Sequence, residues 1–244
     1  MFHPFILMQS GQAWWILRRL RFMLNKMVSN RIRKELGADM KIFCISDTHG
    51  YHRHMREIPQ ADVVVHAGDI CNLGSAKQTE DFLDWFRALP MPHKVLIAGN
   101  HDFLLDTQRQ ADLGKPSQSF DFSGIHYLMD DAVEIDGVTF YGSPWQPEFQ
   151  AMAFNLPREG EGLRQAWQNI PEATNVLVTH TPPYGILDQT NGGFGVGCEL
   201  LTERLAELPQ VKAHVFGHVH EAAGYQQQSG RQFVNAFEPR VIEI

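Results

Sequence analysis

Seven side chains with oxygen or imidazole donors lie in five short clusters along this chain of 244 residues. In chain order they are Asp47 and His49, Asp69, Asn100, His180, and His218 with His220. Carboxylate, amide and imidazole donors without thiolate suit Mn²⁺, Fe, Zn²⁺, Ni²⁺ or Co²⁺ rather than an iron–sulfur cluster or a structural zinc. Seven ligands are too many for one tetrahedral ion and natural for two ions that share a carboxylate. The set therefore indicates a dinuclear centre, which can hold both oxygens of an in-line displacement at phosphorus.

Each cluster follows a short apolar run that is typical of a β-strand. The runs are Lys41–Ser46, Val63–Ala67, Val95–Ala98, Val176–Thr179 and Ala213–Phe216. Ligands on loops at the carboxyl ends of strands are how an open α/β sheet builds a site. Gly68, Gly99 and Gly217 stand beside the ligands, where glycine lets the backbone turn sharply and keeps the approach to a phosphate clear.

The remaining pattern predicts helices between these strands and a second group of strands. Helical spacing covers Ser75–Leu89, Glu159–Ile170 and Cys198–Leu208, while Ile125–Met129, Ala132–Ile135, Val138–Gly142, Phe233–Ala236 and Arg240–Ile244 read as strands. Asp136-Gly137 between two of these strands is a strong hairpin signal. Buried parallel strands followed by antiparallel ones indicate an α/β fold with two stacked mixed sheets, covered by helices on both outer faces.

The ordered motifs resemble those of the calcineurin-like metallophosphoesterase superfamily. The pattern D-x-H, G-D, G-N-H-D, a lone H and G-H-x-H is complete between residue 41 and about residue 237. The resemblance implies a four-layer α/β/β/α sandwich and a single domain over residues 40–244. It implies that Asp47, His49 and His220 bind one metal, that Asn100, His180 and His218 bind the other, and that Asp69 bridges them. His101 would stabilise developing charge or protonate the leaving oxygen, and Asp102 would orient His101.

A narrower likeness joins the chain to the small metallophosphoesterase-domain phosphodiesterases. It rests on Gly142–Pro147 with Ala153–Asn155, on His180–Pro183 and on Val196–Leu201. Some members of that branch replace the first histidine of G-H-x-H by glycine; this chain has His218, so a full two-metal centre is expected. Cys71, which follows Gly68-Asp69-Ile70, departs from the pattern and raises the question of oxidation or metal poisoning.

The likeness favours a phosphodiesterase that hydrolyses small diesters of the cyclic-nucleotide or nucleotide type. The expected reaction is in-line attack by a metal-bridging hydroxide, with two divalent ions, Mn²⁺ first among them. Hydrolysis of phosphomonoesters or phosphoproteins is the alternative, and a non-catalytic metal-binding scaffold is a further one.

Composition limits the partners. Residues 1–39 hold seven Lys and Arg against two Asp and Glu, which leaves 14 basic and 26 acidic residues, a net charge of −12, in the remainder. The acidic charge of residues 40–244 argues against binding duplex nucleic acid, although short oligonucleotides remain possible substrates. A small-molecule phosphoester is therefore the expected partner.

Three cysteines without zinc or redox spacing favour buried thiols in a reducing compartment. No apolar run approaches the ~20 residues needed to cross a bilayer, and a cytoplasmic protein is expected. Oligomeric state is not readable from this pattern.

Residues 1–39 carry a separate prediction. Residues 13–36 mix apolar and basic side chains at helical spacing, and their arginines follow the apolar stretch, which is the wrong order for a secretory signal. We favour a dispensable extension ahead of the domain, with weak membrane-surface contact through residues 13–36 as the alternative.

The sequence also suggests where several other histidines and aromatic residues lie. We expect His66 and His214 in the core or behind the ligands, and His52, His54, His93 and His126 at the surface. Trp145, Phe154 and Tyr184 either wall a substrate pocket or pack in the core.

Overall fold

Two mixed β-sheets face each other and bury an apolar layer between them. The computed structural model describes residues 39–244, and Met40–Ile244 forms one unit. The first sheet has the strand order β13 (Arg240–Glu243), β1 (Lys41–Ile45), β2 (Val63–Ala67), β3 (His93–Ile97) and β4 (His126–Tyr127). The second has the order β11 (Gly224–Gln228), β12 (Arg231–Asn235), β10 (Ala213–Phe216), β9 (Val176–Thr179), β6 (Val138–Ser143) and β5 (Asp131–Ile135).

Parallel pairing dominates the centre of each sheet. Strands β1 to β4 run parallel, and β13 pairs with β1 in the antiparallel direction. In the second sheet β6, β9, β10 and β12 are parallel, while β5 and β11 are antiparallel at the edges. The carboxyl ends of the parallel strands therefore meet along one edge of each sheet, which is where the predicted ligands follow them.

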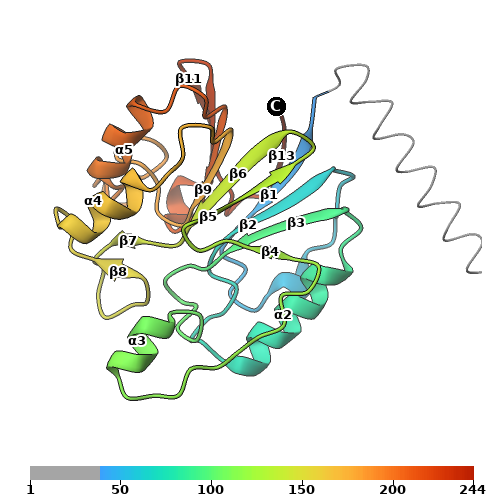
Figure 1. The fold of residues 1–244 in the computed structure, drawn as a ribbon. Coiled ribbons are helices and arrows are strands. Elements are labelled where there is room, and N and C mark those ends of the chain that lie inside the picture. Colours follow the sequence, from blue (N-terminus) through green and yellow to red (C-terminus); the bar gives the residue numbers. More distant parts are fainter. Residues whose placement is uncertain (1–38) are drawn as a thin grey trace, which may run out of the picture. The chain divides into compact units, whose positions relative to one another are not determined.

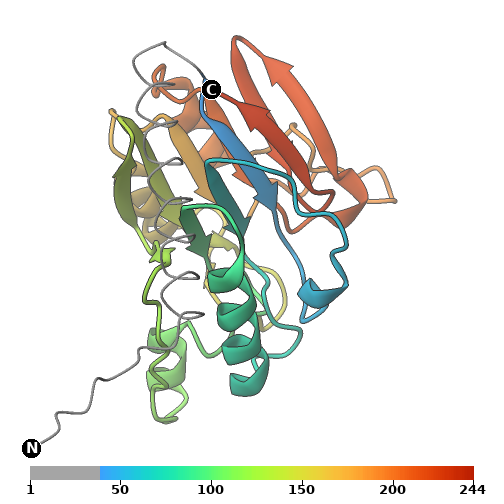
Figure 2. The ribbon, with the colours of Figure 1, turned by 90° about the vertical axis from the view of Figure 1, so that its right-hand side faces the viewer.

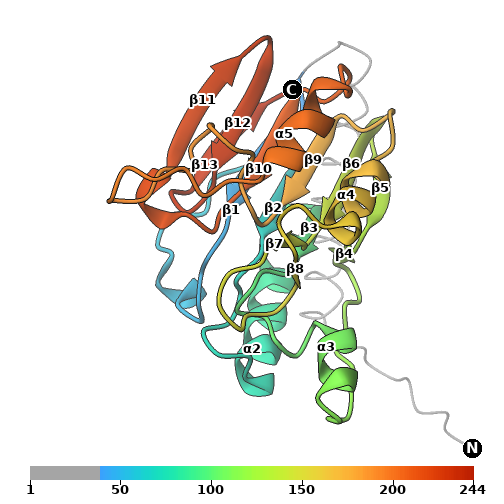
Figure 3. The ribbon, with the colours of Figure 1, turned by 90° about the vertical axis from the view of Figure 1, so that its left-hand side faces the viewer.

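Helices complete four layers. The layer between the sheets contains Val65, Phe140 and Val215. Helix α2 (Ala76–Ala88) covers the outer face of the first sheet (Figures 1 and 2). Its residues Phe82 and Phe86 pack in the core beneath it. Helices α4 (Glu161–Gln168) and α5 (Glu199–Ala206) cover the second sheet (Figure 3). Residues such as Leu163 and Leu201 pack against that sheet. The α/β/β/α sandwich expected from the sequence is confirmed.

Most predicted elements are present, and the Asp136-Gly137 hairpin is one of them. Both residues have positive φ angles, 50° and 82°, and the flanking residues Ile135 and Val138 pair across the turn. Four of the elements in the described residues were not predicted: α3 (Thr107–Asp112), the strand β11, and the two-residue strands β7 (Gln146–Pro147) and β8 (Asn155–Leu156). Two short 3₁₀ helices, η1 (His52–His54) and η2 (His220–Ala222), lie beside the ligand loops.

Predictions for the first 39 residues lie almost wholly outside the described part of the chain. Neither the extension nor the membrane-surface helix over residues 13–36 is therefore tested. Within residues 39–244, no helix combines the length and the apolar content that crossing a bilayer requires.

Candidate dinuclear metal centre

All seven predicted ligands meet at the carboxyl ends of five strands. Asp47 and His49 follow β1, Asp69 follows β2, Asn100 follows β3, His180 follows β9, and His218 and His220 follow β10. Residues that are far apart in the sequence converge because these strands are parallel neighbours within their sheets. The prediction that they form one site agrees with this geometry, although the role of each residue stays a prediction.

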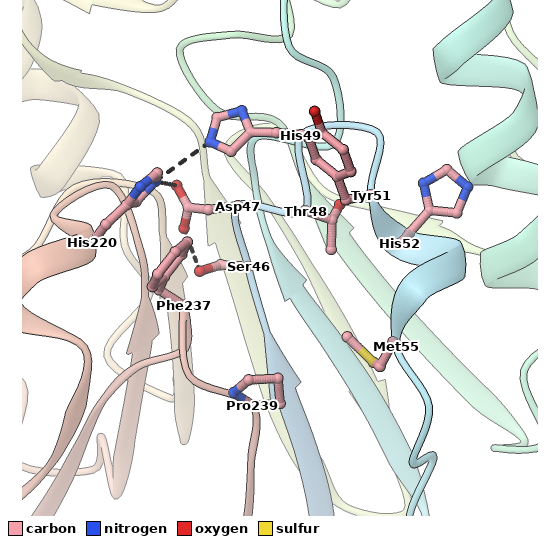
Figure 4. A pocket seen from close by; sticks show the side chains of 10 residues that line it. All are labelled: Ser46, Asp47, Thr48, His49, Tyr51, His52, Met55, His220, Phe237 and Pro239. Carbon is pink, nitrogen blue, oxygen red and sulfur yellow. Dashed lines mark hydrogen bonds and ion pairs between the residues drawn. The ribbon is translucent and has the colours of Figure 1, made fainter.

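A first group comprises Asp47, His49 and His220, whose donor atoms lie within 4.8 Å of one another. Nε2 of His220 is 3.3 Å from Oδ1 of Asp47 and 3.4 Å from Nε2 of His49. Figure 4 shows the three side chains pointing toward one another from the loop after β1 and from the start of η2. The group offers one carboxylate and two imidazoles to a cation.

A second group is centred on Asn100. Its Oδ1 lies 2.8 Å from both Nε2 of His180 and Nδ1 of His218. Oδ2 of Asp69 lies between the two groups, 3.4 Å from Nε2 of His180 and 3.8 Å from Nε2 of His49. This is the position that a bridging carboxylate requires.

Four of the seven ligands have left-handed backbone conformations. The φ angles are 51° for Asp47, 45° for His49, 58° for Asp69 and 68° for His218. Residues other than glycine adopt this region at a cost of about 1–3 kcal/mol each, and such residues concentrate at functional sites. Without these conformations the side chains would continue to alternate between the two faces, as they do along a strand. The left-handed conformations turn them toward a common point instead.

Backbone carbonyls at the end of β2 and in the loop after it fix the orientation of two of the candidate ligand rings. His49 Nδ1 lies 3.1 Å from the Cys71 carbonyl oxygen, and His180 Nδ1 lies 2.9 Å from that of Ala67. A ring that donates its Nδ1–H to a carbonyl presents its Nε2 lone pair to a metal. Sequence reasoning missed this contribution, because every residue carries a carbonyl and the side-chain type gives no signal.

Asp102 stabilises the same loop. Its carboxylate accepts hydrogen bonds from the backbone N–H groups of Gly99, Asp69, Ile70 and Cys71, at 2.8, 2.9, 3.3 and 2.9 Å. Burial and the nearby Asp69 carboxylate raise the pKa of Asp102 to about 7, against the effect of those donors. The prediction that Asp102 orients the His101 ring needs correction: its oxygens are engaged by amides, and it positions the loop that carries Asp69.

The His101 ring is instead oriented by the carbonyl of Asn72, with which its Nδ1 hydrogen-bonds. Its backbone N–H donates to Oδ1 of Asp69 at 2.8 Å. A ring nitrogen of His101 lies within 4.8 Å of donor atoms of His49 and Asp69. Because Nδ1 is engaged, Nε2 is the atom available to a substrate.

The charges of the site match a cation. Burial lowers the pKa of His180, but the carboxylates of Asp69 and Asp47 outweigh it and raise the pKa to about 10. The pKa of Asp69 is lowered despite its burial, because His180, His101 and His49 surround it. A proton held on a buried imidazole between two carboxylates marks a place where positive charge is stabilised. A divalent ion held there by Asp69 and His180 would take the place of that proton.

The glycines leave space that any other residue would fill. A Cβ at Gly99 would lie 2.5 Å from the Asp69 nitrogen and 2.7 Å from Cε1 of His180. A Cβ at Gly68 would lie 2.7 Å from Nδ1 of His180, and one at Gly217 would collide with the Asp47 carboxylate. The donor set, its charge and this close packing fit two divalent ions.

The remaining predicted residues divide between core and surface. His66 and His214 are buried and hydrogen-bond with Thr48 and Thr179, as a core or supporting role requires. Phe154 is buried and Trp145 packs at the edge of the core with its indole N–H on Asp130, so core packing describes both. Tyr184 is exposed and lies outside the cavity described below.

Two predictions about individual surface and thiol residues have clear outcomes. His52 was expected at the surface, but only 1% of it is exposed, because its ring packs on Phe82 and its Nε2 pairs with Asp81. The Cys71 thiol is buried against Thr79, and burial raises its pKa to about 12. That thiol is therefore protonated, and its hydrogen-bond partners are Thr79 and the Ser75 carbonyl rather than the candidate ligands. All three cysteines are buried and free.

Comparison with known proteins agrees with the site. The profile of the calcineurin-like phosphoesterase family matches residues 40–222. Human metallophosphoesterase domain-containing protein 1 is 37% identical over 214 residues, which span 80% of this chain and 65% of the human protein. UPF0046 protein K07C11.7 of Caenorhabditis elegans is 38% identical over 205 residues, 81% of this chain and 69% of that protein. The chain thus matches slightly less than two thirds of the human relative's length.

Solved structures share the fold at low sequence identity. The crystal structure of TT1561 of Thermus thermophilus superposes with a TM-score of 0.55 at 11% identity, and it covers 84% of this chain and 99% of that one. Similarity at this level concerns the fold alone.

Proposed function

Because the chain belongs to the calcineurin-like phosphoesterase family, we propose that its dinuclear centre hydrolyses small phosphodiesters. The observation that carries the proposal is the convergence of all seven donors on two adjacent groups that share Asp69. We propose Mn²⁺ as the metal and a small-molecule diester as the partner.

The residues divide the work of hydrolysis. Asp47, His49 and His220 would hold one ion, Asn100, His180 and His218 the other, and Asp69 both. Bound there, two divalent ions would supply an activated water and neutralise charge on the phosphoryl oxygens. The Asn72 carbonyl holds Nδ1 of His101, so that Nε2 can give a proton to the departing oxygen. Asp102 keeps the Asp69 loop in place through three of its backbone amides and ties it to the loop after β3 through the Gly99 amide.

The surroundings of the site support a diester over a monoester. A monoester dianion or a phosphoprotein carries more negative charge and is commonly held by Arg or Lys. The ten residues that line the cavity beside the site include neither, and several are apolar. A diester has one negative charge and two organic substituents, which this lining suits better.

The test compares bis-p-nitrophenyl phosphate with p-nitrophenyl phosphate, using chelated protein that is resupplied with Mn²⁺. Faster turnover of the diester, lost in Asp69→Asn, is the expected result. Faster turnover of the monoester would place the protein among phosphatases. Failure to hydrolyse either substrate with two ions bound would replace the enzyme proposal by the metal-binding scaffold.

A further inference from the structure

A cavity of about 470 Å³ opens beside the first ligand group. Asp47, His49 and His220 form one side, and Tyr51, Met55, Phe237 and Pro239 supply apolar walls (Figure 4). This volume lies within the range of small-molecule pockets, roughly 300–1,000 Å³. A group bound to the phosphorus held at the metal centre would reach the cavity directly, because three of the ligands line it.

Phe237 gives the cavity a flat aromatic surface. Its ring stacks on His220, with centroids 4.1 Å apart and planes 6° from parallel. The residue is nevertheless 40% exposed, and Tyr51 is 68% exposed. Exposed aromatic rings beside a catalytic centre offer faces on which a planar group can stack. Stacking on His220 also fixes the angle of the Phe237 ring before any ligand arrives.

Contacts with α2 anchor the side of the cavity that lies opposite Phe237. His52 follows Tyr51 in the chain, and its Nε2 lies 3.0 Å from Oδ2 of Asp81 on α2. Arg53 donates to both oxygens of the same carboxylate, from Nε to Oδ2 and from Nη2 to Oδ1. The His52 ring packs against Phe82 and Trp85, with centroids 5.4 and 5.1 Å away. This anchoring positions η1 and the adjoining Tyr51, which lowers the ordering cost of binding.

His101 lies elsewhere around the centre. It does not line the cavity, and its ring is tied to Asn72 on the loop after β2. The group that leaves must depart near His101 if this residue protonates it. The cavity beside His220 is then left for the ester group that remains on the phosphate.

We propose that this cavity binds an aromatic ring of the retained ester group, and that Tyr51 and Phe237 determine specificity for it. The inference rests on the proposed phosphodiesterase function and names its substrate class: diesters with a planar aromatic substituent. Ring stacking and apolar contact supply the recognition, and the lining provides no cationic side chain for a second phosphate.

The test uses phenyl p-nitrophenyl phosphate and methyl p-nitrophenyl phosphate, which share a leaving group and differ in the retained one. The wild-type protein should prefer the phenyl ester. Tyr51→Ala and Phe237→Ala should each reduce the phenyl-to-methyl ratio of kcat/KM by about two- to tenfold, the effect of losing one aromatic contact. Phe237→Tyr, which keeps the ring, should restore the preference. An unchanged ratio in both alanine variants would overturn the inference.

Phe149→Ala is the matched control. Phe149 is 49% exposed and its ring lies edge-on to His218, 5.9 Å away, but it does not line the cavity. The phenyl-to-methyl ratio of kcat/KM in Phe149→Ala should equal that of the wild type. A loss as large as that in Phe237→Ala would show that the preference belongs to the whole mouth of the site, which refutes the cavity assignment.

Binding separates this inference from the proposed function. Phenylphosphonate and methylphosphonate cannot be hydrolysed, and calorimetry with the Mn²⁺-loaded protein gives both dissociation constants while metal analysis checks the loading. Tighter binding of phenylphosphonate that is lost in Phe237→Ala supports the cavity even if neither diester turns over, in which case only the phosphodiesterase proposal fails. If both diesters are hydrolysed but the two phosphonates bind with equal affinity, the phosphodiesterase proposal stands and the cavity inference fails.

Discussion

Adding one methyl group at Gly99 should disable both metal sites. A Cβ at this position would meet the backbone nitrogen of Asp69 at 2.5 Å and Cε1 of His180 at 2.7 Å, with the Asp69 carboxylate closer still. Ordinary contacts begin at about 3.4 Å. The His180 ring would therefore have to retreat by about 0.7 Å, the difference between 3.4 and 2.7 Å, and the Asp69 backbone by about 0.9 Å.

Displacements of this size exceed what a metal site tolerates. Ligand distances in functional sites hold to within about 0.2 Å, and a misplacement near 1 Å can cost about 10²-fold in rate. Gly99→Ala should lower kcat/KM by at least about 10²-fold and reduce the content of both ions. Overpacking should also lower the free energy of unfolding of the metal-free protein by about 1–3 kcal/mol.

The same substitution at Gly162 is the control. This glycine lies in α4, is exposed, and a Cβ there would lie 3.5 Å from the nearest atom of Leu156. Gly162→Ala should leave activity unchanged and raise the free energy of unfolding by up to about 1 kcal/mol, because alanine favours helix. Metal analysis, steady-state kinetics and urea denaturation measure all three quantities. Wild-type activity with two bound ions in Gly99→Ala would refute the packing argument.

Four further predictions follow from the site and the core. His101→Ala should retain both ions and lose about 10²–10⁴ of kcat; metal analysis beside kinetics would expose a ligand role if an ion is lost. Asp69→Asn should reduce the content of both ions, and loss of one alone would contradict a bridging position. Chelation should lower Tm, and Mn²⁺ at one hundred times its Kd should restore about 2.7 kcal/mol for one site. The free energy of unfolding of the metal-free protein should decrease as the pH is lowered past about 6.5, because burial lowers the pKa of His66 to about 3 and that of His214 well below 6.5. Both histidines then stay neutral in the folded protein but bind protons in the unfolded chain, and each contributes at most about 1.4 kcal/mol per pH unit. The free energy of unfolding of His214→Asn should therefore decrease less steeply with falling pH than that of the wild type. Equal slopes in the two proteins would contradict this explanation.

The sequence was sufficient to predict the central strands and to place the candidate ligands at one edge of the fold. Runs such as Val63–Ala67 are apolar apart from His66 and buried along their whole length, as is typical of strands covered on both faces. Asp69 and His180 follow such runs, and parallel strands bring their carboxyl ends to one edge. Strand pattern and ligand chemistry therefore point to the same place without any knowledge of distance.

Elements without an apolar period were not predictable in this way. Helix α3 has six residues with the sequence TQRQAD, and it forms because Asp106 accepts the Arg109 N–H and also binds the Phe154 N–H. Strand β11 has the sequence GYQQQ and exists by pairing with β12 along one edge. Their stability comes from tertiary hydrogen bonds, which local composition does not encode.

The substrate-facing side of the site illustrates the same limit more sharply. An aromatic residue in a sequence is most simply assigned to the core, and Phe154 and Trp145 do pack there. Phe237 differs only through its tertiary position: the Ser46 N–H donates to the Ala236 carbonyl at 3.0 Å, which places the chain after β12 beside the end of β1. With the Ala236 N–H bound to the Phe216 carbonyl at 2.7 Å, this segment sets Phe237 on His220, opposite the loop that carries Tyr51. Metal ligands are recognisable because few residue types can do their chemistry, whereas a recognition wall uses residues that the core also uses, so only the fold distinguishes the two.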